Sequence, residues 1–158
     1  MKAVVQRVKS ASVTVDGKLI SQIGPGLLCL IGLGEGDGES DIEYITRKIL
    51  NARLWASDRK AWDVNVQQQG YEVLCVSQFT LHGRLNGNKP DFSRAMGPNE
   101  ARTMYTALLD RLRSAYDINK IKDGVFGAMM QVELVNDGPV TFILESLKSG
   151  DASLASMD

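Results

Sequence analysis

The sequence has little of what zinc sites and membrane spans require. It contains one histidine and two cysteines, and the cysteines, Cys29 and Cys75, lie in apolar segments. These residues do not make up the ligand set of a usual zinc site, whereas a magnesium site built from carboxylates alone stays open. The longest apolar run, residues 27–33, is far shorter than the roughly 18 residues that cross a bilayer. We therefore expect neither a zinc site nor a membrane span.

The chain also lacks an export signal and a strong charge of either sign. Gln6, Arg7 and Lys9 interrupt the N-terminal segment and leave no apolar core for a signal peptide. Together with cysteines in apolar surroundings, this indicates the cytoplasm. The net charge of −1 excludes the broad basic face of a protein that grips long nucleic acid. One basic neighbourhood, residues 82–94, favours a solvated loop, while a smaller nucleic-acid contact stays open.

The length suits a single domain that begins with strands. We place the domain at residues 1–147 and a flexible polar tail at residues 148–158. Valine-rich stretches on both sides of Asp16-Gly17 predict an opening hairpin, because Asp-Gly is typical of a two-residue hairpin turn. The apolar run at residues 27–33 is too short for a helix and predicts a strand that is buried on both faces.

Two amphipathic helices and further strands follow. Ser40 and Glu43 indicate a capping box and a helix over residues 41–54, and Pro98 begins a second apolar stripe that ends near Ala115. Further strands are predicted at residues 71–80, 125–135 and 139–146, with a turn at residues 136–138. The predicted fold class is α+β, with a mainly antiparallel, curled, barrel-like sheet and two packed amphipathic helices.

The segment VSQFTLHG, residues 76–83, places the only histidine close to two hydroxyl groups. A serine nucleophile needs a base that accepts its proton, but the odd spacing of Ser77 and His82 points them to opposite faces of a strand. The sequence also has no G-x-S-x-G elbow. From the residues alone, a strand end with polar tips is the simpler interpretation, and a Ser77/His82 hydrolase of small esters stays open.

Two short motifs together indicate a family. Ser-Gln-Phe-Thr-Leu stands at residues 77–81, and Gly-Pro-Val-Thr stands at residues 138–141 after Asn136-Asp137. With further segments such as MKAVVQRV, KILNARLW and NKPDFSRAM, nearly the whole chain resembles the D-aminoacyl-tRNA deacylase family. The departures are small: Met129 stands where the family often has a polar residue, and the tail after about residue 146 has no counterpart.

This resemblance implies a hydrolase, without metal or organic cofactor, that cleaves the ester between a D-amino acid and the 3′ end of tRNA. Such an activity is chiral proofreading in translation, and glycyl-tRNA is a further candidate substrate. The resemblance also implies a homodimer in which the Gly-Pro loop of each subunit completes the pocket of the other. A nucleic-acid-binding module without catalysis, on the same fold, is the alternative.

The resemblance also assigns roles to residues. The catalytic segment comprises Ser77, Gln78, Phe79 and Thr80, in which main-chain N–H groups near Phe79 and Thr80 face the developing oxyanion and Gln78 holds the terminal adenosine. Substrate binding and chiral selection are implied for Arg7, Phe126, Met130, Gly138, Pro139, Val140 and Thr141. Among these, Phe126 and Met130 wall the pocket, Arg7 steadies the Gly-Pro loop, and the Gly138–Pro139 bond is expected to be cis.

Overall fold

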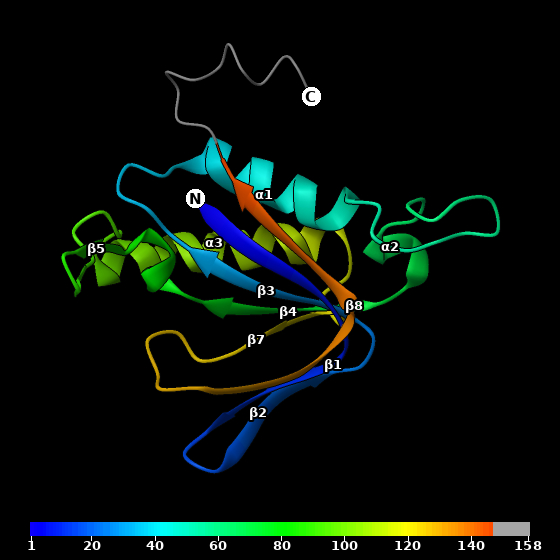
Figure 1. The fold of residues 1–158 in the computed structure, drawn as a ribbon, viewed down its shortest axis with the longest axis horizontal. Coiled ribbons are helices and arrows are strands. Elements are labelled where there is room, and N and C mark those ends of the chain that lie inside the picture. The colour runs from blue at the N-terminus through cyan, green and yellow to red at the C-terminus, as the bar shows by residue number, and fades with distance from the viewer. Residues whose placement is uncertain (147–158) are drawn as a thin grey trace.

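A computed structural model describes residues 1–146 of the chain (Figure 1), so the predicted tail at residues 148–158 lies outside the described part. The strands are β1 (Lys2–Val15), β2 (Lys18–Ile23), β3 (Gly26–Gly32), β4 (Glu72–Ser77), β5 (Arg84–Asn86), β6 (Lys89–Asp91), β7 (Ile121–Asp123) and β8 (Gln131–Glu145). The helices are α1 (Glu39–Asn51), the one-turn α2 (Val66–Gln69), the 3-10 helix η1 (Phe79–His82) and α3 (Pro98–Ala115). None of the helices in residues 1–146 is both long and apolar enough to cross a membrane.

The main sheet has the strand order β2-β1-β3-β4-β7, and β8 pairs with β1. Antiparallel pairs join β1 to β2, β3 and β8, whereas β3–β4 and β4–β7 are parallel. The parallel pairs follow from the connections, because α1 lies between β3 and β4 in the chain and α3 lies between β4 and β7. The predicted α+β class with a curled, barrel-like sheet is confirmed.

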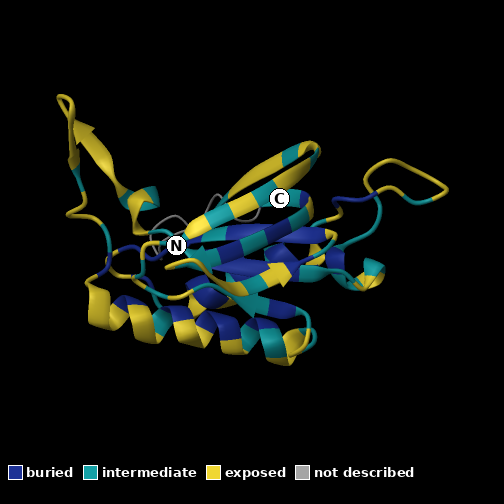
Figure 2. Cartoon of the chain, turned by 90° about the horizontal axis from the view of Figure 1, so that it is seen from below, coloured by how far each residue is buried: buried dark blue, intermediate teal, exposed yellow. Residues whose placement is uncertain are grey.

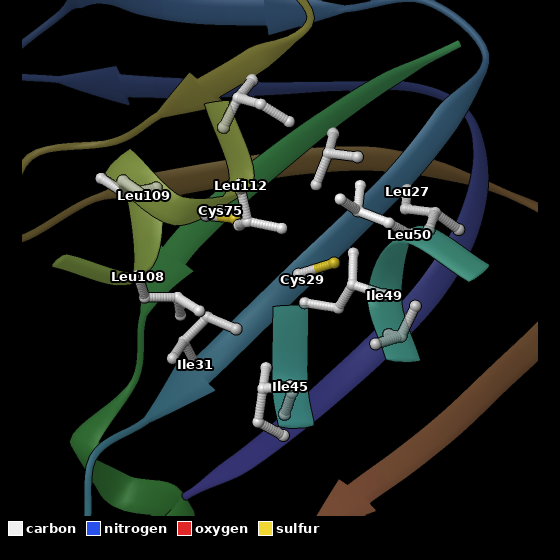
Figure 3. Packing of buried hydrophobic residues seen from close by; sticks show 14 of the residues in the cluster. Leu27, Cys29, Ile31, Ile45, Ile49, Leu50, Cys75, Leu108, Leu109 and Leu112 are labelled. Atoms are coloured by element: carbon white, nitrogen blue, oxygen red, sulfur yellow. The ribbon is translucent and has the colours of Figure 1, made fainter. Parts of the chain in front are cut away.

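Two apolar clusters fill the two faces of the sheet. α1 and α3 cover one face, where Ile45, Ile49, Leu108 and Leu112 are buried against alternate residues of β3 (Figure 3). The intervening residue Leu28 packs into the second cluster, on the other face of the sheet. Because β3 is buried on both faces, its sequence is apolar without alternation, as predicted.

Helix α3 has the predicted bounds, but α1 begins and ends earlier than predicted. The predicted Ser40/Glu43 capping box is wrong, because Asp41 Oδ2 accepts from the Gly38 N–H at 2.8 Å and Gly38 is therefore the N-cap. At the other end, Ala52 has an extended backbone, which terminates the helix at Asn51.

The predicted turn at residues 136–138 is also wrong, because β8 passes through it as one strand. β1 pairs with β8 on both sides of this segment, with Gln6 opposite Thr141 and Val8 opposite Asn136. The residues between these pairs form a bulge, in which β8 has more residues than β1. Asn-Asp-Gly therefore lies in a bend of one continuous strand and not in a turn between two strands (Figure 1), since β1 pairs with β8 on both sides of it.

Candidate active site

The Ser-Gln-Phe-Thr-Leu motif begins at the end of β4. The strand stops at Ser77, earlier than predicted, and the Gln78 N–H donates to the Ile31 carbonyl at 2.7 Å. The chain then turns into η1, whose first residue, Phe79, is 56% exposed. The motif thus leaves the buried sheet and presents its second half at the surface.

The main chain of this turn offers two hydrogen-bond donors. Phe79 and Thr80 occupy the first turn of η1, where N–H groups have no partner inside the helix. No hydrogen bond from either N–H group to another group is found within residues 1–146. The Gln78 side-chain amide donates to Thr80 Oγ1, which fixes that hydroxyl beside the two donors.

His82 serves the structure of this turn instead of pairing with Ser77. Its Nε2 lies 2.9 Å from the Gly32 carbonyl oxygen, and the ring packs against Gly34. Burial lowers the pKa of His82, an effect that the hydrogen bond to Gly32 partly opposes. The ring is therefore neutral at pH 7, and no contact with the Ser77 hydroxyl is found in the described chain.

The loop between β7 and β8 carries the two predicted wall residues to the same end of the sheet. The Gly124 N–H donates to the Cys75 carbonyl at 3.2 Å, two residues before the motif. Phe126 packs on Tyr105 at 5.6 Å between ring centroids, and Met130 packs into the second apolar cluster. The structure therefore brings Phe126 and Met130 to the end of β4 that carries Ser77.

The Gly-Pro-Val-Thr motif forms the bulge of β8. Gly138 and Pro139 are exposed, their peptide bond is cis, and Gly138 has a φ of +123°. Val140 is half-buried behind them, and Thr141 is exposed within the strand. A methyl group at Gly138 would be strained by this φ and would lie 2.9 Å from Val140 Cγ2.

Arg7 of β1, predicted to steady the Gly-Pro loop, contacts the bulge at Asp137. Its Nε donates to the Asp137 carbonyl at 3.2 Å and lies 3.4 Å from Asp137 Oδ2. The same guanidinium donates to the Leu54 carbonyl and lies 6.0 Å from the Trp62 ring. The bulge is therefore tied to the body of the fold by one side chain.

Within one chain, the two motifs lie at opposite ends of the sheet. Arg7 pairs with Leu27 of β3, whereas Gln78 bonds to Ile31 of the same strand. Four residue steps of a strand separate these positions by about 13 Å. In Figure 1, β3 and β4 point toward β5, while the bend of β8 lies at the opposite end.

Sequence reasoning missed the residues that support each motif. The Arg102 guanidinium carbon lies 4.9 Å from the centre of the Phe126 ring, and Trp62 stacks beside Arg7. These pairs are far apart in the chain and belong to no shared motif, so no local pattern marks them. No group of three or more potential metal-ligating side chains occurs in residues 1–146.

Known proteins share this sequence over most of its length. A sequence model of the family described as D-Tyr-tRNA(Tyr) deacylase matches residues 4–145. The chain is 55% identical to a D-aminoacyl-tRNA deacylase of Dictyostelium discoideum over 148 residues, which cover 92% of this chain and 98% of that protein. It is 51% identical to D-aminoacyl-tRNA deacylase 1 of Homo sapiens over 154 residues, covering 97% of this chain and 74% of that protein.

Two solved structures share the fold. One, described as c-Myc DNA Unwinding Element Binding Protein, is 51% identical, with a TM-score of 0.90 and coverage of 94% of this chain and 100% of that chain. The other, described as a probable eukaryotic D-amino acid tRNA deacylase, is 15% identical, with a TM-score of 0.77 and coverage of 90% and 97%. At 15% identity, the similarity to this second structure shows only that the two chains share a fold.

Proposed function

This chain belongs to the D-Tyr-tRNA(Tyr) deacylase family, and from that membership we infer that it hydrolyses the ester between a D-amino acid and the 3′ end of tRNA. The reaction releases free amino acid and tRNA and so removes amino acids of the wrong hand before protein synthesis uses them. We propose that Phe79 and Thr80 supply the central catalytic element. The observation that carries this proposal is a pair of main-chain N–H groups, at the exposed turn after β4, that have no partner within residues 1–146.

Both donors would stabilise the oxyanion that develops when water attacks the ester carbonyl. They are fixed by the end of β4 and by η1, so they need no reorganisation when charge develops. One such donor contributes about 2.7–4 kcal/mol to transition-state stabilisation. We propose that Gln78, whose side chain donates to Thr80 Oγ1, contacts the terminal adenosine. We also propose that Phe126 and Met130 wall the pocket, since their loop is joined to β4 by the Gly124–Cys75 hydrogen bond.

Two variants at one position test the main-chain donor. Phe79→Ala removes the ring and keeps the N–H, whereas Phe79→Pro removes the N–H as well, at a first helical position that suits proline. The proline variant is expected to have a kcat about 10²–10³ lower than the alanine variant, with similar melting temperatures. Equal rates for the two variants would remove the proposed role of this N–H.

We further propose that the enzyme is a homodimer in which the Gly-Pro loop of one subunit completes the active site of the other. We call residues 78–80 the catalytic turn. In one chain this turn and the Gly-Pro loop are about 13 Å apart along β3, which is too far for the two to line one pocket. β8 also presents exposed apolar side chains near the loop, one on each face of the strand, since Phe142 and Ile143 are 46% and 76% exposed. Phe142 borders a hollow of about 300 Å³ whose lining is mainly apolar.

In this arrangement, the Gly138 and Pro139 carbonyls accept from the substrate ammonium and crowd one side of its α-carbon. An L side chain would occupy the crowded side, whereas a D side chain points away from it. Glycine has no side chain for the loop to exclude, so glycyl-tRNA is a second proposed substrate. Each tenfold of discrimination requires about 1.4 kcal/mol, which a clash with a fixed loop can exceed.

Mixing two inactive variants distinguishes action across subunits from action within one. Gly138→Ala deforms the loop and Phe79→Pro removes a donor. If the sites are shared, each mixed dimer contains one site with both lesions and one with none, and a re-equilibrated equal mixture should recover about a quarter of wild-type activity. No recovery, with mixed dimers shown by mass spectrometry, would refute the shared site, and a fully active monomer would refute the dimer.

A nucleic-acid-binding module without catalysis is the second candidate. It is favoured by one solved structure that is 51% identical to this chain and is described as a DNA unwinding element binding protein. Hydrolysis of matched D- and L-aminoacyl-tRNA by one purified preparation decides between the two.

We also propose that the enzyme acts in the cytoplasm, since Cys29 and Cys75 are free, buried thiols that face each other across β3 and β4.

A further inference from the structure

The hairpin of β5 and β6 is an arm beside the catalytic turn. In the described part of the chain the two strands pair only with each other, and every residue from Arg84 to Pro90 is exposed. In Figure 2 the arm stands away from the body of the protein. It follows η1 directly, and Phe92 at its base packs on Phe79 with 5.0 Å between ring centroids. The arm therefore borders the proposed site while contributing little to the core.

The arm and its base, residues 83–94, carry a net positive charge, whereas the whole chain has a net charge of −1. This segment contains Arg84, Lys89 and Arg94 and a single acid, Asp91. Arg84 Nε lies 3.8 Å from Asp91, and Lys89 makes no ion pair within residues 1–146. Exposed ion pairs of this kind contribute about 0–1 kcal/mol, so the stability of the fold does not account for these charges.

Protection of an exposed sheet edge is the simplest alternative explanation for charges on such a hairpin. Lysine is the charge used most for this purpose, so edge protection accounts for Lys89. It does not account for Arg94, which lies outside both strands, or for a positive excess beside the catalytic turn. A polyanionic partner that reaches this turn explains both.

We propose that the arm binds the phosphate backbone of the duplex acceptor stem of tRNA through Arg84, Lys89 and Arg94. The inference rests on the proposed function, because a 3′ end that enters the catalytic turn leaves its duplex outside, on the side of the arm. Three residues of a strand extend about 10 Å, so the exposed arm can follow the backbone of one strand of a duplex over several nucleotides. Duplex RNA is recognised through shape and backbone, which suits an enzyme that acts on many tRNAs.

Binding of uncharged tRNA tests the arm without requiring hydrolysis. The arm variant is Arg84→Gln, Lys89→Gln and Arg94→Gln together. The matched control is Lys18→Gln, Arg47→Gln and Lys120→Gln, which changes the net charge equally at other elements. Fluorescence anisotropy from 50 to 200 mM salt measures the Kd for whole tRNA and for a single strand that ends in CCA.

The arm variant is expected to bind whole tRNA roughly tenfold or more weakly, with the slope of log K against log salt reduced by about 2 to 3. Its affinity for the CCA strand, and the control variant's affinity for both, should match the wild type. An unchanged affinity and slope for the arm variant, or an equal loss in the control, would overturn the proposal. Tighter wild-type binding to duplex DNA than to an acceptor-stem RNA of the same length would also overturn it.

A second readout separates this proposal from the proposed function. Hydrolysis of a D-aminoacyl ester of adenosine, which lacks a duplex, should be equal in the wild type and the arm variant. If neither protein hydrolyses any D-aminoacyl ester, the proposed function fails, and tRNA binding still reports on the arm. The single variant Lys89→Glu, at the exposed first residue of β6, should weaken tRNA binding without lowering the melting temperature, and unchanged binding would again count against the arm.

Discussion

Gly34 has no room for a methyl group, so Gly34→Ala tests how tightly the fold holds the catalytic turn. A Cβ at this position would lie 2.6 Å from His82 Cε1 and 3.0 Å from Nδ1. The Gly34 backbone is held in place because its N–H donates to Asp37 Oδ2 at 2.6 Å and it bridges Ala95. The His82 ring is held because its Nε2 lies 2.9 Å from the Gly32 carbonyl oxygen. The added methyl must therefore displace His82, the last residue of η1.

Overpacking of this kind costs about 1–3 kcal/mol in the free energy of unfolding. For a chain of this size, the melting temperature should fall by about 2–4 °C for each kcal/mol. Because η1 carries the two main-chain donors, a shift approaching 1 Å should lower kcat/KM about 10- to 100-fold. Differential scanning fluorimetry and deacylation assays measure the two effects. Gly24→Ala is the control, since nothing lies within 4 Å of a Cβ there.

The double variant Gly34→Ala/His82→Ala identifies the residue that is displaced. If the clash is with the ring, the double variant should be more stable than the sum of the single losses predicts. Strictly additive losses would show that the methyl group displaces something else. A Gly34→Ala protein with the melting temperature and rate of the wild type would refute the rigidity inferred for this region.

Substitutions of four other residues, Asp37, His82, Ser77 and Thr80, should change or preserve stability and activity in measurable ways. Asp37→Asn removes the charge that pairs with the buried Met1 ammonium at 2.8 Å, and urea unfolding should show a loss of about 3–5 kcal/mol, whereas a loss below about 1 kcal/mol would contradict the buried pair. Because burial lowers the pKa of His82, the unfolded chain binds its proton first, so stability should be full above about pH 6.5 and fall below it. His82→Asn should reduce that dependence in acid titrations, and identical profiles would exclude His82 as its source. Ser77→Ala and Thr80→Ala should each retain deacylase activity, because neither hydroxyl contacts a base in residues 1–146, and a trapped acyl-enzyme on Thr80 would refute this.

Local periodicity predicted the parts of the fold that local interactions determine. The apolar stripe of α3 comprises Ala101, Met104, Tyr105, Leu108 and Leu112. It predicted the helix correctly because all five residues are buried or partly buried on one face of it. For Asn136-Asp137-Gly138, the predicted turn was wrong because non-local pairing decides the structure there. Its turn propensity is local, whereas the pairing of β8 with β1 on both sides of it is not.

The candidate site shows the same limit. The motif residues are contiguous in the chain, so a sequence pattern finds them. The contacts that hold them in place join distant segments, such as Arg7 with Leu54 and Arg102 with Phe126. No periodicity marks such a pair, and only the folded chain brings its members together.

The pairing of β1 with β8 has a consequence for how the protein folds. Lys2 lies opposite Glu145, so β1 completes its pairing only after every other described strand has been synthesised. Until then, β1 presents a row of unsatisfied backbone groups along an open edge, which favours association with other chains. Closure of this long-range pair should also set the refolding rate, since non-local strand pairing is slow.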